Sequence, residues 1–267
     1  GYSRYLRNRF WRIYPEMWVS VGIEIIIMCI LYSGWNVRDT ALFTVTQATI
    51  FQFWTPDSLR GYGCGTPNGA LWTMGITIQF YIIAWFLYRI LKKKKLQVWI
   101  GAIVGCLALS KICQIGIDSF QMKILSKLYG QTIVKFLWIF LVGMFVAQFY
   151  DALVPALKKW WSIIFMIGAV VSITGLDIEI GYNVLKTITV LMAVIGFAYR
   201  YPKLKLKKDI SFGIFIYHMT VVNAMITFGF TGKLIWFFTA TLISCVLGYI
   251  STVTIGHYAA RRKIIIR

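Results

Sequence analysis

The residues with the clearest chemical potential are two arginines near the start of the chain. Arg9 and Arg12 lie three positions apart in the opening segment GYSRYLRNRFWRIYPEMW, so on a helix they share one face. A guanidinium group presents a planar fork of donors that binds phosphate oxygens in pairs. This spacing is typical of a phosphate site at a membrane surface, and equally of a basic anchor that orients the first membrane helix.

Two further polar groups lie inside apolar segments. Glu24 follows Arg12 by twelve residues, which is about 18 Å along a continuous helix. A carboxyl group at that depth indicates a functional site, or a protonated acid bonded to a neighbouring helix. His218 is one of 2 histidines, and histidine titrates close to neutral pH, as a general base must. The alternative for His218 is a packing role in which the ring donates to a carbonyl.

The segments that must position these groups are membrane helices. Of 267 residues, 59% are hydrophobic, and several apolar runs reach the roughly 20 residues that span a bilayer. The run at 41–54 is too short to cross and predicts a re-entrant or interfacial helix. We expect an all-α, polytopic transmembrane bundle of about eight spans, near 17–33, 69–91, 97–117, 132–150, 160–175, 184–199, 210–229 and 234–257.

The distribution of charge predicts the orientation. The net charge is +19, and the basic residues form short blocks between apolar runs, where they meet lipid headgroups and orient the chain. No soluble module carries a basic face, which excludes a nucleic-acid partner. With eight spans the basic blocks share one side. We therefore expect a multi-pass protein of the inner (plasma) membrane with both ends of this chain in the cytoplasm.

The sequence divides naturally after the arginine motif. Residues 1–16 predict a cytoplasmic motif that leads into the first span, and residues 17–267 predict a single membrane-embedded domain. Pro15 suits the first turn of the spanning helix, where its missing N–H costs nothing, and Glu16 suits the positive end of that helix dipole.

Three segments of the chain resemble motifs of the acyltransferase-3 family of integral membrane enzymes. The opening YLRNRFWRIYP resembles the family motif F-x-x-x-R-x-x-R-[IL]-x-P, with Tyr5 in the aromatic place. Residues 211–225, SFGIFIYHMTVVNAM, resemble S-[YF]-G-I-[YF]-x-x-H, with His218 in place. Residues 69–83, GALWTMGITIQFYII, resemble W-[ST]-L-x-x-E-x-x-F-Y, with matches at Trp72, Thr73, Phe80 and Tyr81.

The chain departs from the family pattern in two places. Thr77 stands where the motif W-[ST]-L-x-x-E-x-x-F-Y has glutamate. The family also has a span or two before the arginine motif, with an arginine and a membrane-embedded histidine thought to be catalytic, and the sequence opens after that point. Eight spans and two upstream spans make the ten-span layout usual for the family. We therefore expect that the family's N-terminal part is missing from this sequence.

The resemblance implies an O-acyltransferase. It implies that an acyl group, usually acetyl, passes from acyl-CoA to a hydroxyl group. Acyl-CoA is then a co-substrate and not a bound cofactor. The hydroxyl belongs to a cell-surface polysaccharide, another glycan or a lipid-linked sugar. It implies that Arg9 and Arg12 bind acyl-CoA and that His218 is catalytic, or lies in the acceptor site if the upstream histidine does the chemistry. The acceptor-site and intramembrane polar candidates are Glu24, Trp72, Thr73 and Tyr81, and for the aromatic rings packing is the alternative. No Cys or His spacing indicates a metal.

Two other functions stay open. A transporter or flippase-like carrier would use Glu24 with Lys111, Lys135 and Lys186 along a substrate path. The sequence shows no internal repeat and no pair of Gly/Pro-broken helices of the kind that transporters have. The remaining alternative is a truncated, catalytically inactive family member that serves as an interaction partner.

Overall fold

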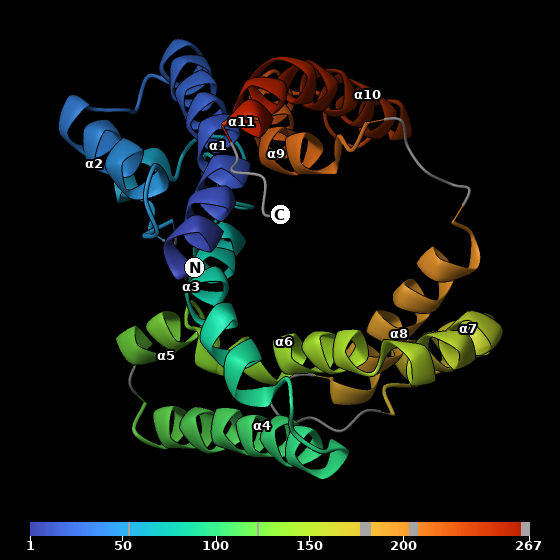
Figure 1. Cartoon of the computed structure of the whole chain (residues 1–267). Coiled ribbons are helices and arrows are strands. Elements are labelled where there is room, and N and C mark those ends of the chain that lie inside the picture. The colour runs from blue at the N-terminus through green and yellow to red at the C-terminus, as the bar shows by residue number, and fades with distance from the viewer. Residues whose placement is uncertain (53, 122, 177–182, 203–207, 263–267) are drawn as a thin grey trace. The chain divides into compact units, whose positions relative to one another are not determined.

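The computed structural model describes residues 1–52, 54–121, 123–176, 183–202 and 208–262, and their regular structure is helical (Figure 1). The chain forms two compact units, which are Gly1–Ile82 with Leu206–Arg267, and Ile83–Lys205. The first unit holds every residue that the sequence singles out as a site candidate. The all-α prediction is confirmed.

Helices form at all eight expected places. In the part of the chain that the structure describes, 6 helices are long and apolar enough to cross a membrane. The two helices at 184–199 and 210–229 have 17 residues each, or about 25 Å, which is slightly less than the roughly 30 Å hydrocarbon core. The eight are α1 (Tyr2–Leu31), α3 (Trp72–Leu91), α4 (Leu96–Ser119), α6 (Ile133–Gln148), α7 (Tyr150–Thr174), α8 (Val184–Arg200), α9 (Ser211–Thr227) and α10 (Leu234–Ser251).

The expected start of the first helix is wrong. Helix α1 begins at Tyr2 and continues through Pro15, so Pro15 and Glu16 lie in the middle of a helix rather than in its first turn. Proline removes the N–H that would bond the carbonyl of Trp11. The helix stays continuous because the turns before and after Pro15 are packed into the core: Ile13 and Met17 are buried in one cluster. The arginine motif is therefore a rigid part of the first helix.

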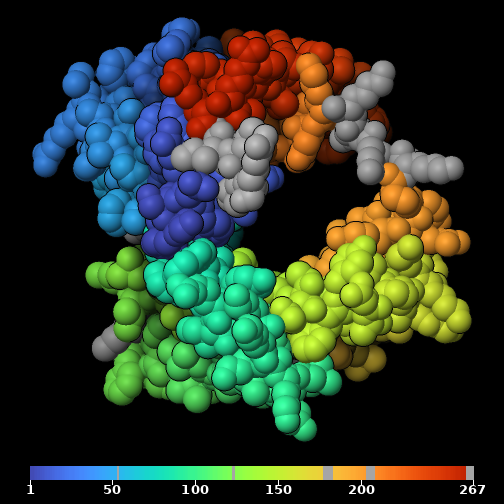
Figure 2. Space-filling model, viewed as in Figure 1, coloured from blue at the N-terminus to red at the C-terminus, as the bar shows by residue number. Residues whose placement is uncertain are grey.

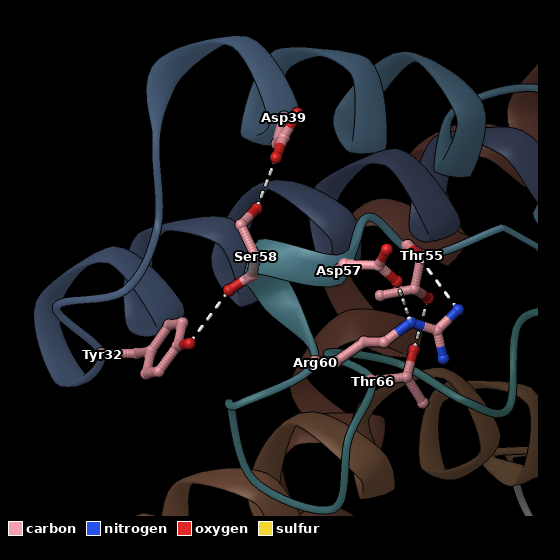
Figure 3. A network of polar contacts seen from close by, with 7 residues as sticks. All are labelled: Tyr32, Asp39, Thr55, Asp57, Ser58, Arg60 and Thr66. Carbon is pink, nitrogen blue, oxygen red and sulfur yellow. Dashed lines mark hydrogen bonds and ion pairs between the residues drawn. The ribbon is translucent and has the colours of Figure 1, made fainter.

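A short helix and a loop follow α1. Helix α2 (Val37–Gln47) covers only the first half of the 41–54 run that predicts an interfacial helix, and the 3-10 turn η1 (Asp57–Leu59) lies in the loop after it. Ser58 in this turn connects α2 with the end of α1. Its Oγ donates to Asp39 of α2 at 2.6 Å, and its carbonyl accepts from the hydroxyl of Tyr32, directly after α1, at 2.9 Å (Figure 3). Thr55 and Thr66 share a hydrogen bond of 2.8 Å. These contacts fix the loop at the C-terminal end of α1.

Helices α1 and α9 lie side by side and run in the same direction. Arg12 is close to Asp209, and eight residues further along, Ser20 Oγ donates to the carbonyl of Ile216 at 2.9 Å. Because both contacts advance in the same direction along the chain, α1 and the segment that leads into α9 run in parallel between Arg12 and Ser20.

Helix α10 crosses α9 at two glycines. A Cβ on Gly213 would lie 2.6 Å from the Cα of Gly248, so the two backbones touch. After Ser251 the helix widens into a π-helix (Thr252–Gly256) and continues as α11 (His257–Arg261). In Figure 2 the red surface of this C-terminal segment adjoins the blue surface of α1.

The second unit consists of α4, α5 (Lys123–Tyr129), α6, α7 and α8. Large side chains fill it, since Trp99 and Trp138 are each 1% exposed. A glycine allows the close approach of α7 and α8, because a Cβ on Gly196 would meet the Leu157 carbonyl oxygen. Many of its exposed side chains are large and apolar, among them Ile112, Phe165 and Val194, as is typical of helices in a membrane.

Candidate functional site

A cavity of about 610 Å³ opens between α1, the start of α9 and the segment that follows α10. Three of its lining residues are basic, Arg12, Lys208 and Arg261, and two are acidic, Glu16 and Asp209. Arg261 Nε donates to His257 Nε2 at 3.0 Å, which orients the guanidinium group at the cavity wall. Three cations around one concavity are suited to bind a polyanion such as a chain of phosphates.

The floor of this cavity is built around Glu16. The side chain is 8% exposed, and its Oε2 accepts a hydrogen bond of 2.9 Å from Ser251 Oγ. A Cβ on Gly256 would lie 2.8 Å from Glu16 Oε1, so the Glu16 carboxyl group packs directly against the backbone of this glycine. The π-helix between Ser251 and His257 produces the wider turn that admits Glu16, and such turns are frequent at functional sites.

Asp209 lies beside Arg12 at the start of α9. Its Oδ1 accepts hydrogen bonds from the Ser211 hydroxyl at 2.6 Å and the Ser211 N–H at 3.1 Å. These bonds, the hydroxyl first, hold the pKa of the Asp209 carboxyl below its usual value, and the charge of Arg12 adds to the effect. The carboxylate is thus ionised at neutral pH and caps α9.

The lowered pKa of Asp209 makes the stability of the folded protein depend on pH. A carboxylate with a depressed pKa stabilises the folded state fully above its unfolded pKa, about 3.9, and this stabilisation is lost as the pH falls through the folded value. We expect Asp209→Asn to have a lower Tm than wild type at pH 7 and a smaller drop in Tm between pH 5 and pH 3. Thermal unfolding in detergent checks this, and parallel curves for the two proteins would contradict it.

Arg9 does not line the Arg12 cavity. Its guanidinium carbon lies 4.9 Å from the ring centre of Tyr81 and 5.1 Å from that of Tyr5. Arg9 and Tyr81 both line a separate, apolar cavity of about 160 Å³ between α1 and α3. The structure therefore places the two arginines of the motif in different cavities, and it places Tyr81 with Arg9.

The remaining acceptor candidates on α3 lie near its first turn. Thr73 Oγ1 donates to the carbonyl of Ala70 at 3.0 Å, and Thr77 Oγ1 donates to that of Thr73 at 2.8 Å, so both hydroxyls bond within their own segment. Trp72 is the first residue of α3 and lies about 13.5 Å along the helix from Tyr81. These candidates do not converge on one site.

Glu24 is completely buried between α1 and the loop that follows α2. Its exposure is 0%, and neither carboxyl oxygen makes a hydrogen bond of standard geometry to a described residue. The Asn68 amide lies close enough to interact with the carboxyl group. Tyr62 is also close: burial raises the pKa of Tyr62 to about 12, and Glu24 contributes to this rise. The phenol is therefore neutral and able to donate.

His218 has one nitrogen available. Its Nδ1 lies 2.8 Å from the carbonyl oxygen of Phe215, and because a carbonyl only accepts, Nδ1 carries the proton and a neutral ring has its lone pair on Nε2. His218 follows Ile216 by two residues and so lies about 200° around α9 from it. Ile216 belongs to the core cluster with Ile13 and Met17 of α1. His218 therefore faces away from α1 and from the Arg12 cavity.

Several residues of the cavity were not singled out by sequence reasoning. Lys208 and Arg261 counted only as members of basic blocks, and Asp209 was not distinguished. The available signals were local: Glu16 stands four residues after Arg12, on the same face of a helix, and Lys208 and Asp209 directly precede the segment SFGIFIYH.

Comparison with known proteins agrees with the three motifs. The family model described as an acyltransferase domain matches residues 1–255. The chain is 23% identical over 248 residues to Nodulation protein 10 of Rhizobium leguminosarum bv. viciae, a match that covers 84% of this chain and 66% of that protein. No solved structure matches. With the matched model covering nearly all of its length, the chain belongs to the acyltransferase-3 family of membrane acyltransferases.

Proposed function

We propose that the protein transfers an acyl group, in particular acetyl, from acyl-CoA to a hydroxyl group. The hydroxyl belongs to a cell-surface polysaccharide, another glycan or a lipid-linked sugar. Membership of the family supports acyl transfer in general. The observation that carries the donor is the cavity that joins Arg12, Lys208 and Arg261. Acyl-CoA is a polyanion with a neutral, flexible arm, and this cavity offers three cations beside the buried interior of the bundle.

The two arginines of the motif take different parts in this proposal. Arg12 binds donor phosphates directly, as a fork of N–H donors in a partly enclosed site. Arg9 is held against two aromatic rings, and it adds positive charge at the same end of α1. The distribution of basic blocks supports a position of this end of the helix at the cytoplasmic face of the inner membrane, where acyl-CoA is available. Trp72 and Thr73, at the opposite end of the neighbouring helix α3, remain candidates for contact with the glycan.

The reaction needs a group that takes the proton of the acceptor hydroxyl. Within this chain the family resemblance points to His218, and the lone pair on its Nε2 fits a general base. Its position on the far side of α9 from the Arg12 cavity separates it from the donor. Replacing His218 and measuring acyl transfer decides whether this side chain is the base.

Transfer itself can be measured with the purified protein in lipid vesicles. The donor is acetyl-CoA labelled in the acetyl group, and the acceptors are a cell-wall polysaccharide fraction and a lipid-linked glycan fraction. We expect label in an ester that mild alkali releases, and only when protein, donor and acceptor are all present. Uptake of label into the vesicle lumen without ester formation would favour a carrier instead, and absence of any ester would contradict the proposal.

A further inference from the structure

A histidine lies in the wall of the Arg12 cavity, beside one of the three cations. His257 and Arg261 both line this cavity, and they lie four residues apart on the same face of α11. Arg261 Nε donates to His257 Nε2 at 3.0 Å. The match to the family model ends at residue 255, so membership of the family assigns no role to either residue. We call these two residues the His257–Arg261 pair.

The π-helix before α11 brings this pair to the cavity. Ser251 donates to the Glu16 carboxyl group and Gly256 packs against it, although the two residues lie five positions apart. Residues with that separation point about 140° apart on an α-helix, and the wider π-turn brings both toward α1. His257 follows Gly256 directly. Its side chain, and that of Arg261 one turn later, therefore lies at the edge of this contact, where the cavity opens.

The hydrogen bond within the pair fixes which ring nitrogen carries the proton. A guanidinium group only donates, so His257 Nε2 is the acceptor, and the ring is neutral with its proton on Nδ1. Arg261 uses its Nε for this bond and keeps the N–H groups of its terminal nitrogens. The pair thus combines a full positive charge with N–H donors from two side chains, a combination that is suited to bind a phosphate group.

The three cations of the cavity differ in how far their charge is already balanced. Arg12 lies beside the Asp209 carboxylate, whose negative charge offsets part of its own. Lys208 Nζ lies 5.5 Å from the ring centre of Tyr249. Arg261 is bonded to a neutral ring, and it forms no ion pair with a carboxylate of the described residues. The position best suited to a highly charged anion is therefore at Arg261.

Acyl-CoA carries two kinds of phosphate. Each phosphorus group of the diphosphate bridge has about one negative charge, whereas the 3′-phosphate is a monoester with a charge of about −1.5 to −2 at neutral pH. We infer that the His257–Arg261 pair binds the 3′-phosphate of the donor, which leaves the diphosphate to Arg12 and Lys208. The inference rests on the proposed function. His257 donates from Nδ1 to a phosphate oxygen, and through Nε2 it holds Arg261 in position.

The test compares the binding of acetyl-CoA and of acetyl-3′-dephospho-CoA to the purified protein in phosphatidylcholine vesicles. The two donors differ only in the 3′-phosphate. For wild type we expect a Kd roughly 10- to 100-fold lower for acetyl-CoA, the range of hydrogen bonds to a charged group. Arg261→Gln should make the two Kd values nearly equal by weakening the binding of acetyl-CoA alone. His257→Leu should remove part of the preference, because Arg261 keeps its charge.

Two further variants make the test specific. Glutamine at position 257 offers an acceptor to Arg261 and an N–H donor to a phosphate, so His257→Gln should retain more of the preference than His257→Leu. Arg262→Gln is the matched control. Arg262 is the next residue, carries the same charge and donates to the Tyr258 hydroxyl at 3.1 Å, but it does not line the cavity. Its ratio of the two Kd values should equal that of wild type.

Equal binding of the two donors by wild type, or an equal loss of the preference in Arg262→Gln, would overturn the assignment of the pair. A lipid headgroup offers the same phosphate chemistry, and if phosphatidic acid in the vesicles removes the preference while phosphatidylglycerol at equal surface charge does not, the pair binds lipid instead. We expect no such difference. In each case acetyl transfer by wild type would leave the proposed function standing, whereas absence of both acetyl-CoA binding and transfer would reject that function itself.

Discussion

Arg12→Ala is expected to abolish measurable acyl transfer, because it removes the one guanidinium group that α1 contributes to the large cavity. Loss of a charge-assisted, bidentate contact in a partly enclosed site costs about 2–5 kcal/mol, or roughly 30- to several-thousand-fold in affinity. The Kd for acetyl-CoA, measured with labelled donor on the purified protein, should rise by that factor. The salt dependence of binding should also weaken, since one phosphate contact is lost.

Arg7→Ala is the matched control for this measurement. Arg7 belongs to the same helix and carries the same charge, but unlike Arg12 it does not line the large cavity. If the arginines act only through the general positive potential of the segment, both variants will lose similar affinity, and the assignment of Arg12 to the donor fails. Arg9→Ala adds a third comparison. Because Arg9 contacts Tyr5 and Tyr81 rather than the large cavity, we expect a smaller loss of donor affinity than for Arg12→Ala.

The helical architecture could be predicted from the sequence because apolar runs of membrane length leave few alternatives. The start of α1 could not. Proline followed by glutamate is a reliable signal for the first helical turn, but here the neighbouring residues Ile13 and Met17 are buried on both sides of Pro15. Tertiary packing therefore carries the helix through a residue that local rules assign to its beginning.

The candidate site was predictable only in part. The spacing of Arg9 and Arg12 marks a chemically capable segment, but it does not reveal that Arg9 stacks on Tyr81 while Arg12 lines another cavity. The residues that line the cavity with Arg12 lie far away in the chain, and they include Lys208, Asp209 and Arg261. They reach it because α1 and α9 run in parallel with Ser20 opposite Ile216, and no pattern within one sequence encodes that register.

For Glu24 the sequence identifies the residue but not its surroundings. A carboxyl group in an apolar run is conspicuous, and the sequence identifies it as a candidate. Its neighbours Tyr62 and Asn68 belong to a loop whose composition predicts only turns. The loop adopts its position through the bonds of Ser58 and Asn223. The surroundings of Glu24 are therefore visible only in the folded chain.

Gly213→Ala is expected to destabilise the protein strongly. The new Cβ would lie 2.6 Å from both the Cα and the carbonyl oxygen of Gly248, which are backbone atoms and cannot rotate away. Helices α9 and α10 must separate, and overpacking of this kind costs about 1–3 kcal/mol. Separation would also displace Ser251, three residues after Gly248, from Glu16, so donor affinity should fall together with Tm.

Gly22→Ala in α1 gives the opposite expectation for the same chemical change. A Cβ at Gly22 meets no atom within 4 Å, and replacing glycine by alanine inside a helix stabilises it by about 0.5–1 kcal/mol. Thermal unfolding in detergent should therefore raise Tm for Gly22→Ala and lower it by several degrees for Gly213→Ala. Equal shifts in the two variants would mean that α9 and α10 do not touch at their glycines, and the floor of the Arg12 cavity would then need a different support.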